Sequence, residues 1–433
     1  MTETIPCDVL VIGGGPAGST AATLLAEAGR DVVLLEREAH PRFHIGESLL
    51  PRNLALFERL GVLDQVRSIG VHKPGAEFVS DATGQAIAFP FRHALDNAYP
   101  HAWQVRRAEL DELLFRNAGR RGARTMQRTR VRTVHLAKQP GARATAEADG
   151  PAGPLRFEPR YILDATGRDA LLAGAMRTKQ ANKRNSTAAL YAHFRGIPRR
   201  GGETDGYITI HLAEDGWFWT IPLQDGVISV GFVGDQSAFK GRRGTASELF
   251  HDRIRRSPTL SARMGRAKAV SEVHSAANYS YRSRSGFGPG HMLIGDAYGF
   301  VDPMFSTGVL MAMTGGERGA AVAHAALDDP ARGEAMAAAA CRELGRSMDR
   351  IGWLIYRIND PALRALFFAP RNTLRMRDGI INLLAGNLHG GLRAEVPVLA
   401  FKGVYHAAKL LHRLGVRPRT GDGWAGEHAM AAE

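Results

Sequence analysis

Apolar and polar positions near the N-terminus follow the order strand, turn, helix, strand. Residues 8–12 form a short apolar run, and residues 13–18 read Gly-Gly-Gly-Pro-Ala-Gly. An alanine- and leucine-rich stretch extends to Gly29, and a second apolar run over 31–35 is followed by Glu36. Short apolar runs bounded by glycine are typical of buried parallel strands. The pattern therefore predicts a β-α-β unit at the start of an α/β fold.

The glycine turn of this unit has the spacing of a dinucleotide-binding site. Gly13 allows the tight turn, Gly15 lets the backbone approach a pyrophosphate, and Gly18 lets the helix pack on the strand. The helix N-terminus that follows, at residues 16 and 17, directs unpaired N–H groups and a positive dipole end at phosphate. Glu36 lies about 20 residues further on, where an acid can bind a ribose hydroxyl. The predicted nucleotide contacts are Gly13, Gly15, Pro16, Ala17, Gly18 and Glu36.

Three later segments extend this site. Residues 162–167 read Ile-Leu-Asp-Ala-Thr-Gly, residues 292–297 read Met-Leu-Ile-Gly-Asp-Ala, and residues 105–111 read Val-Arg-Arg-Ala-Glu-Leu-Asp. Alone, each could be a turn aspartate, a capping aspartate or a solvated arginine. Together they resemble the para-hydroxybenzoate hydroxylase-like FAD-dependent oxidoreductases. That resemblance implies FAD as the cofactor, Asp296 at its ribityl chain, and contacts from Arg107, Thr166 and Gly167.

The rest of the chain predicts a second sheet and a helical end. Alternating segments between 188 and 233 predict strands, 247–264 predicts a helix, and periodic stretches from about 308 predict helices to near 414. We expect an α/β fold with a Rossmann-type FAD-binding domain over 1–180 and 276–325, a β-sheet substrate-side domain over 181–275 and a helical C-terminal region over 326–433. The glycines of 286–290 precede a strand, so we expect no second nucleotide site and no NAD(P)H domain.

Composition favours a large cytoplasmic enzyme. The 433 residues are 44% hydrophobic and 23% charged, enough for a sizeable core. Two cysteines provide no disulfide framework, and the sequence predicts no metal site. Residues 1–7 lack the features of a signal peptide, and no apolar run has the length of a transmembrane helix.

Four motifs carry a closer resemblance. Residues 41–51 read Pro-Arg-Phe-His-Ile-Gly-Glu-Ser-Leu-Leu-Pro, 73–76 read Lys-Pro-Gly-Ala, 217–222 read Trp-Phe-Trp-Thr-Ile-Pro, and 300–309 read Phe-Val-Asp-Pro-Met-Phe-Ser-Thr-Gly-Val. They resemble motifs of the flavin-dependent halogenases, most closely the phenol, pyrrole and carrier-protein-dependent branch, over nearly the whole chain. The resemblance implies Lys73 and Glu47 as catalytic residues and further FAD contacts at Arg37, Ile45, Gly46, Ser48 and Pro303.

Each motif also has a chemical interpretation and a structural alternative. Alternation places Trp217, Trp219 and Ile221 on one face of a strand, as a wall between organic substrate and flavin or as ordinary core packing. Ser306, Thr307 and Gly308 precede a helix, so their N–H groups can bind halide or only support the flavin ring. Glu47 can be catalytic or can orient its neighbours. Lys73 can deliver hypohalous acid, or it can be a surface lysine in a turn.

The chain is basic, with a net charge of +13. A C-terminal cluster includes Lys402, His406, Lys409, His412, Arg413, Arg417 and Arg419. It can be a solvated face, a docking surface for an acidic carrier protein, or a peripheral contact with an anionic membrane. No recognition motif accompanies the charge, so we expect no nucleic-acid partner.

Two functions fit these observations. The first is an FADH2- and O2-dependent halogenase that oxidises chloride or bromide and halogenates an electron-rich aromatic ring, free or tethered to an acyl carrier protein, through Lys73. It would depend on a separate flavin reductase. The alternative is a non-halogenating FAD-dependent monooxygenase or alkene reductase, because the fold alone does not select the reaction.

Overall fold

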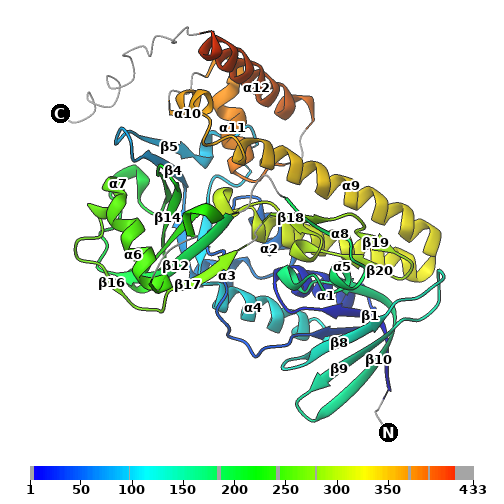
Figure 1. The fold of residues 1–433 in the computed structure, drawn as a ribbon. Helices are drawn as coiled ribbons and strands as arrows, with labels where there is room; N and C mark the ends of the chain where they lie inside the picture. Colours follow the sequence, from blue (N-terminus) through cyan, green and yellow to red (C-terminus); the bar gives the residue numbers. More distant parts are fainter. Residues whose placement is uncertain are drawn as a thin grey trace.

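The first sheet contains the parallel strands that the N-terminal pattern predicts (Figure 1). The structure is a computed structural model that describes residues 4–96, 98–182, 187–239, 244–277, 280–368, 372–388 and 391–414. The strand order is β19-β20-β10-β1-β2-β7, and β8 and β9 continue from β10 as an antiparallel extension. Their bounds are β1 Thr4–Ile12, β2 Val32–Leu35, β7 Arg124–Met126, β8 Arg130–His135, β9 Thr145–Gly150, β10 Gly153–Asp164, β19 Phe287–Gly288 and β20 His291–Leu293.

Apolar runs place this sheet in the interior. All four residues of β2 and the last four of β1 are buried, as expected for parallel strands covered on both faces. Helix α1 (Pro16–Glu27) packs against α8 (Gly308–Asp328), and glycine permits the close approach: a Cβ at Gly316 would overlap the carbonyl of Ala17. Helices α4 (Arg107–Arg120) and α9 (Pro330–Ile355) pack against α1 and α8 respectively.

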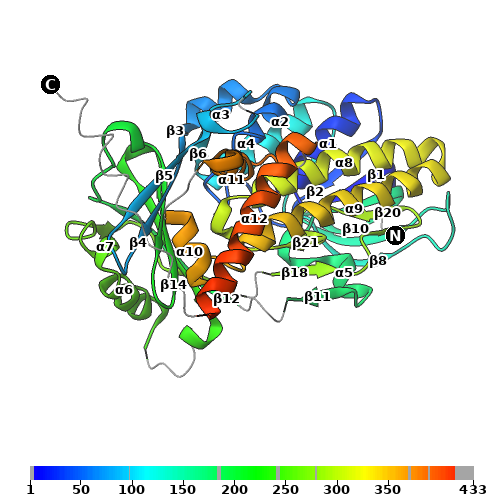
Figure 2. The ribbon, with the colours of Figure 1, turned by 90° about the horizontal axis from the view of Figure 1, so that it is seen from above.

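The second sheet stands beside the first (Figures 1 and 2). Its order is β16-β12-β15-β14-β13-β4-β5, and β17 also pairs with β12. The strands are β4 Gly75–Ser80, β5 Ala86–Pro90, β12 Thr187–Arg195, β13 Ile208–Leu212, β14 Gly216–Pro222, β15 Ile228–Asp235, β16 Lys268–Ala269 and β17 His274–Ala277. Strands β4 and β5 therefore join this sheet from within the range 1–180, and the proposed domain boundaries stay a prediction.

Shorter elements connect the two sheets. Two small sheets contain β3 Gly70–Lys73 with β6 Ala102–Val105, and β11 Lys179–Ala181 with β18 Tyr281–Ser283 and β21 Gly299–Phe300. The remaining α-helices are α2 Asn53–Arg59, α3 Leu63–Ile69, α5 Leu171–Ala175, α6 Ala246–Arg256, α7 Pro258–Ser261, α10 Pro361–Phe368, α11 Met376–Leu384 and α12 Leu392–Arg413.

The C-terminal helices cover one side of the molecule. Seen from above, α12 lies over the region between the two sheets (Figure 2). Among the described helices, none combines the length and hydropathy needed to cross a bilayer. The predicted α/β fold, with its second sheet and helical end, is confirmed.

Candidate active site

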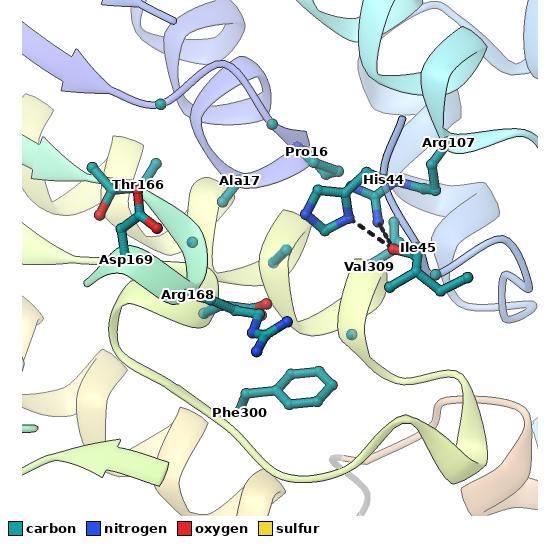
Figure 3. A pocket seen from close by; sticks show the side chains of 18 of the residues that line it. Pro16, Ala17, His44, Ile45, Arg107, Thr166, Arg168, Asp169, Phe300 and Val309 are labelled. Carbon is teal, nitrogen blue, oxygen red and sulfur yellow. Dashed lines mark hydrogen bonds between the residues drawn. The ribbon is translucent and has the colours of Figure 1, made fainter. Parts of the chain in front are cut away.

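A cavity of about 810 Å³ opens where the parallel strands end (Figure 3). Strands β1, β10 and β20 end at Ile12, Asp164 and Leu293, and the turns after them contribute to its wall. The carboxyl edge of such a sheet is where α/β folds bind nucleotides. The predicted residues that line the cavity are Gly13, Gly15, Pro16, Ala17, Glu36, Arg37, Ile45, Gly46, Glu47, Ser48, Arg107, Thr166, Gly167, Trp217, Trp219, Ile221, Asp296, Pro303, Ser306 and Gly308.

Three predicted residues do not line the cavity. Gly18 lies inside α1, where a Cβ would overlap the carbonyl of Gly13, so its contribution is to packing. Thr307 is buried directly before α8. Lys73 is buried behind the cavity wall, on β3.

The glycine turn has the shape that a pyrophosphate requires. Gly13 adopts a φ of +112°, which side chains rarely adopt. A Cβ on Gly15 would have no neighbour nearer than 3.7 Å and would extend into the open cavity. Helix α1 begins directly afterwards without a side-chain cap, so its first N–H groups are available to an anion. These features fit the diphosphate of FAD.

Glu36 joins the glycine turn to a basic residue. Its Oε2 accepts hydrogen bonds from the backbone N–H of Gly14 (3.0 Å) and from Arg42 (3.2 Å). Arg42 also pairs with Asp111 at 3.1 Å. Glu36 is thus oriented at the cavity wall, where the sequence predicts a ribose contact. Arg42 also lines the cavity; its place in the 41–51 motif was the available signal, but its role there was not predicted.

Arg107 holds the segment that follows. It forms two hydrogen bonds to Asp111, at 2.8 and 3.0 Å, and donates another to the carbonyl of Ile45 at 2.8 Å. Burial opposes ionisation of Asp111, but the charge and hydrogen bonds of Arg107 outweigh it and lower the pKa of Asp111. Figure 3 shows His44 and Arg107 both directed at the Ile45 carbonyl. Residues 44–46 are therefore fixed against the cavity.

Asp296 provides an acidic group in the cavity wall. It follows β20 in the turn that the sequence predicts, and desolvation raises its pKa to about 6. A carboxylate there can accept hydrogen bonds from the hydroxyls of a ribityl chain. Arg168 and Phe300 extend into the same space (Figure 3). Neither was predicted as a ligand, although Phe300 begins the 300–309 motif and Arg168 directly follows the 162–167 segment.

Two indole side chains of the second sheet form part of the cavity wall, the indole wall. Trp217, Trp219 and Ile221 lie on one face of β14 and line the cavity together. The two indole rings are 5.9 Å apart, and Trp219 donates a hydrogen bond to Ser229 on β15 at 3.2 Å. Gly231, paired with Trp219 across the strands, leaves the space that the indole ring fills.

Glu47 lies between the cavity and a histidine of the second sheet. Its Oε1 contacts His193 Nε2 at 2.8 Å, whereas its Oε2 is buried and has no hydrogen-bond partner among the described residues. The carboxylate is 1% exposed and the imidazole 15%. No sequence signal marked His193, which lies within the regular alternation of β12.

The loop before α8 approaches the cavity from the helix N-terminus. Ser306 adopts a left-handed φ of +58°, and α8 begins at Gly308 with no side-chain cap. Ser306, Gly308 and Val309 line the cavity. This geometry directs the first N–H groups of a 21-residue helix at the predicted flavin site.

Lys73 is not the surface lysine of the structural alternative. It is 1% exposed, its Nζ donates to the carbonyl of Leu49 at 2.7 Å, and the ring of Phe91 lies 5.2 Å from Nζ. Burial lowers its pKa to about 7, and among the described residues no acidic side chain pairs with it. Leu49, whose carbonyl accepts this hydrogen bond, directly follows Ser48, which lines the cavity. The Lys73 amine therefore contacts the residue next to the cavity lining.

The basic C-terminal cluster is partly paired. Lys409 contacts Asp360 at 2.6 Å, and Lys402 lies 4.9 Å from the ring of Trp353. Arg417 and Arg419 lie outside the described residues, as do the side chains of His412 and Arg413. Two of the described cations of the cluster are therefore held by neighbouring side chains, whereas His406 is exposed.

Comparisons with known proteins agree with this geometry. The FAD-binding domain family matches residues 6–318. The tryptophan 2-halogenase of Chondromyces crocatus is 34% identical over 311 residues, covering 70% of this chain and 58% of the relative. The flavin-dependent halogenase armH1 of Armillaria mellea is 32% identical over 367 residues, covering 79% and 69%. The chain spans about three fifths of the length of the first curated relatives that it matches.

Solved structures share the fold over nearly the whole chain. A flavoprotein/dehydrogenase from Cytophaga hutchinsonii has a TM-score of 0.84 at 27% identity and covers 95% of this chain and 100% of its own. The myxobacterial chondrochloren halogenase CndH has a TM-score of 0.73 at 28% identity, with 94% and 97% covered. With the cavity and its indole wall, these similarities establish that the chain belongs to the FAD-binding domain family and, within it, to the flavin-dependent halogenases.

Proposed function

We propose that this protein uses reduced FAD and O2 to oxidise chloride or bromide and to halogenate an electron-rich aromatic substrate. The observation that carries this proposal is the shared cavity: the glycine turn, the indole wall and the N-terminus of α8 all line it. Bound reduced FAD would supply the activation of O2 that converts halide to hypohalous acid. Trp217, Trp219 and Ile221 would keep a bulky aromatic substrate away from the flavin while leaving room for an ion.

The halide would bind at Ser306, Thr307 and Gly308. Two of these residues line the cavity, and the uncapped helix start provides backbone N–H donors with a positive dipole end. Backbone donors hold an anion without a full counter-charge, which keeps the halide reactive. The buried side chain of Thr307 would fix this turn rather than contact the ion.

Lys73 would transfer the halogen. With a pKa of about 7, much of its amine is neutral near neutral pH. The neutral amine can exchange an N–H hydrogen for halogen, and the hydroxyl of hypohalous acid then leaves as water with that hydrogen. The aromatic carbon takes the halogen from nitrogen, the ring loses a proton, and the nitrogen gains a proton, which restores the amine. The protonated amine can instead donate a hydrogen bond to hypohalous acid. In both routes Nζ must leave the Leu49 carbonyl, its present acceptor.

Glu47 is placed to receive the proton that the aromatic ring releases. It lines the cavity, and its Oε2 is buried without a partner in the described chain. His193, in contact with the other oxygen, is more exposed and would pass the proton towards solvent. This arrangement supports a catalytic role for Glu47 and adds His193 as the residue that would connect Glu47 to solvent.

The substrate would be a phenol or a pyrrole, free or on an acyl carrier protein, and a separate flavin reductase would supply FADH2. The need for a separate reductase is supported by the cavity lining. Among the described residues, a single glycine-rich β-α-β turn lines the nucleotide cavity. Purified protein alone should therefore oxidise NADH slowly, and an unrelated flavin reductase should restore turnover.

The direct test supplies reduced FAD, O2 and bromide together with a simple phenol, and analyses the products by mass spectrometry. A brominated phenol supports the proposal, and Trp217→Ala with Trp219→Ala should shift product towards hydroxylation. One observation favours the alternative: the dehydrogenase from Cytophaga hutchinsonii matches over its whole length. A hydroxylated or reduced product from the wild-type protein, without halogenation, would establish that alternative.

A further inference from the structure

Helix α12 carries most of the exposed large apolar side chains in the described residues. Seven of these side chains lie on it or directly after it, whereas four lie elsewhere, at Phe43, Val270, Tyr356 and Leu374. The seven are Leu392, Val396, Leu399, Val404, Leu410, Leu411 and Leu414. Leu392 is 79% exposed and Leu399 is 60% exposed. Single exposed leucines are common on protein surfaces, but such a concentration on one element marks an interaction site.

Five of these side chains form a ridge made of two groups, one towards each end of the helix. At 3.6 residues per turn, Leu392, Val396, Leu399, Leu410 and Leu414 lie on one face of the helix. The opposite face is already used, because Val398, Phe401 and Tyr405 are buried against the protein. A helix of 22 residues gives the ridge a length of about 33 Å. Figure 1 shows α12 at the edge of the molecule, away from the first sheet.

A row of basic residues follows the ridge. Lys402, His406 and Lys409 have the spacing that places them along one side of the helix, next to the leucines, where Lys402 also lies against Trp353 and Lys409 pairs with Asp360. Glu395 is the only acid in α12, and it pairs with Arg350 at 2.6 Å. The whole chain has a net charge of +13. The ridge and its basic edge are what an interfacial helix presents to a membrane, where leucines enter the acyl boundary and basic side chains reach the headgroups.

We propose that α12 binds the surface of an anionic lipid bilayer, lying in the headgroup region with its leucine ridge buried. Charge argues against a second copy of this chain as the occupant, because pairing two ridges would bring two basic rows together. The position of the helix argues against a carrier protein, since in the described chain no residue of α10, α11 or α12 lines the cavity. The proposal does not depend on the halogenase reaction.

Vesicle co-sedimentation of the full-length protein tests it. Wild-type protein should sediment with phosphatidylcholine vesicles that contain about one third phosphatidylglycerol, less with pure phosphatidylcholine, and less again at high salt. Leu392→Glu combined with Leu399→Glu should reduce the partition coefficient more than tenfold. The matched control is Leu374→Glu, which adds a charge at another exposed leucine and should leave binding unchanged.

Unchanged FAD affinity in both variants would show that the fold is intact. Failure of the wild-type protein to bind the anionic vesicles would overturn the proposal, as would equal binding by the double variant. Sedimentation equilibrium provides the other decisive outcome: a wild-type dimer that the double variant dissociates would assign the ridge to self-association. If the wild-type protein binds an immobilised acidic carrier protein but not the vesicles, and the double variant does not bind the carrier protein, the ridge would be assigned to that partner.

Discussion

Replacing Lys73 with methionine should stabilise the protein while it abolishes halogenation. The amine is 1% exposed, and its one hydrogen-bond acceptor is a neutral carbonyl, that of Leu49. A buried ammonium without a carboxylate is costly, and the cost appears as the fall of its pKa from 10.5 to about 7. Methionine has a similar length and no charge, so Lys73→Met removes this cost.

The expected gain can be worked from these contacts. One pKa unit corresponds to about 1.4 kcal/mol, so the burial of this amine costs about 5 kcal/mol below pH 7. The variant leaves the Leu49 carbonyl without its donor, which costs about 1–3 kcal/mol. We therefore expect the free energy of unfolding of Lys73→Met to exceed that of the wild type by about 2–4 kcal/mol at slightly acidic pH.

The pH dependence identifies the cause. Between pH 7 and 10.5 the unfolded chain keeps the proton that the folded chain has lost, so wild-type stability rises with pH. The advantage of Lys73→Met should therefore shrink by about 1.4 kcal/mol per pH unit over that window and reach zero between about pH 8.5 and pH 10. Near pH 10.5 the Leu49 carbonyl, which has lost its donor, should leave the variant less stable than the wild type by about 1–3 kcal/mol.

The assay is urea unfolding of FAD-free protein at several pH values, since bound cofactor would add its own stabilisation. Lys268→Met is the matched control, because Lys268 is exposed and its replacement should change stability by less than about 0.5 kcal/mol. Product analysis with reduced FAD, O2 and bromide follows on the same samples. A Lys73→Met protein that is less stable at every pH, or that halogenates at the wild-type rate, would refute the reasoning.

Three further predictions concern the cavity. Gly15→Val should abolish FAD binding, because its side chain would fill the space of the pyrophosphate; a normal flavin titration would disprove the assignment. Gly231→Ala should displace the indole of Trp219 and increase hydrogen peroxide released per FADH2 consumed, measured by a peroxide assay, and an unchanged ratio would argue against the wall. Glu47→Gln should lower kcat at least tenfold with FAD affinity retained, and His193→Ala should shift the pH profile of kcat. If kcat and its pH profile are both unchanged, the Glu47–His193 pair has only a structural role.

Most of the cofactor site could be predicted from local patterns in the sequence. The strand, turn and helix around Gly13 follow from glycine spacing and apolar runs, and the common face of Trp217, Trp219 and Ile221 follows from the period of a strand. Pairings between distant segments were not accessible in the same way. No local pattern indicated that β4 and β5 would add to the second sheet, or that β12 would bring His193 to Glu47. Such contacts depend on tertiary packing, which no periodicity encodes.

The segment 45–49 explains why Lys73 can be catalytic although it lies outside the cavity lining. Arg107 holds the carbonyl of Ile45, Glu47 and Ser48 line the cavity, and the carbonyl of Leu49 accepts the hydrogen bond from Lys73. The cofactor wall and the acceptor of the buried amine are therefore one short stretch of backbone. Any movement of this stretch when FAD binds changes the acceptor geometry of Lys73. Because a carbonyl holds the amine less strongly than a carboxylate would, the lysine can exchange this partner for hypohalous acid.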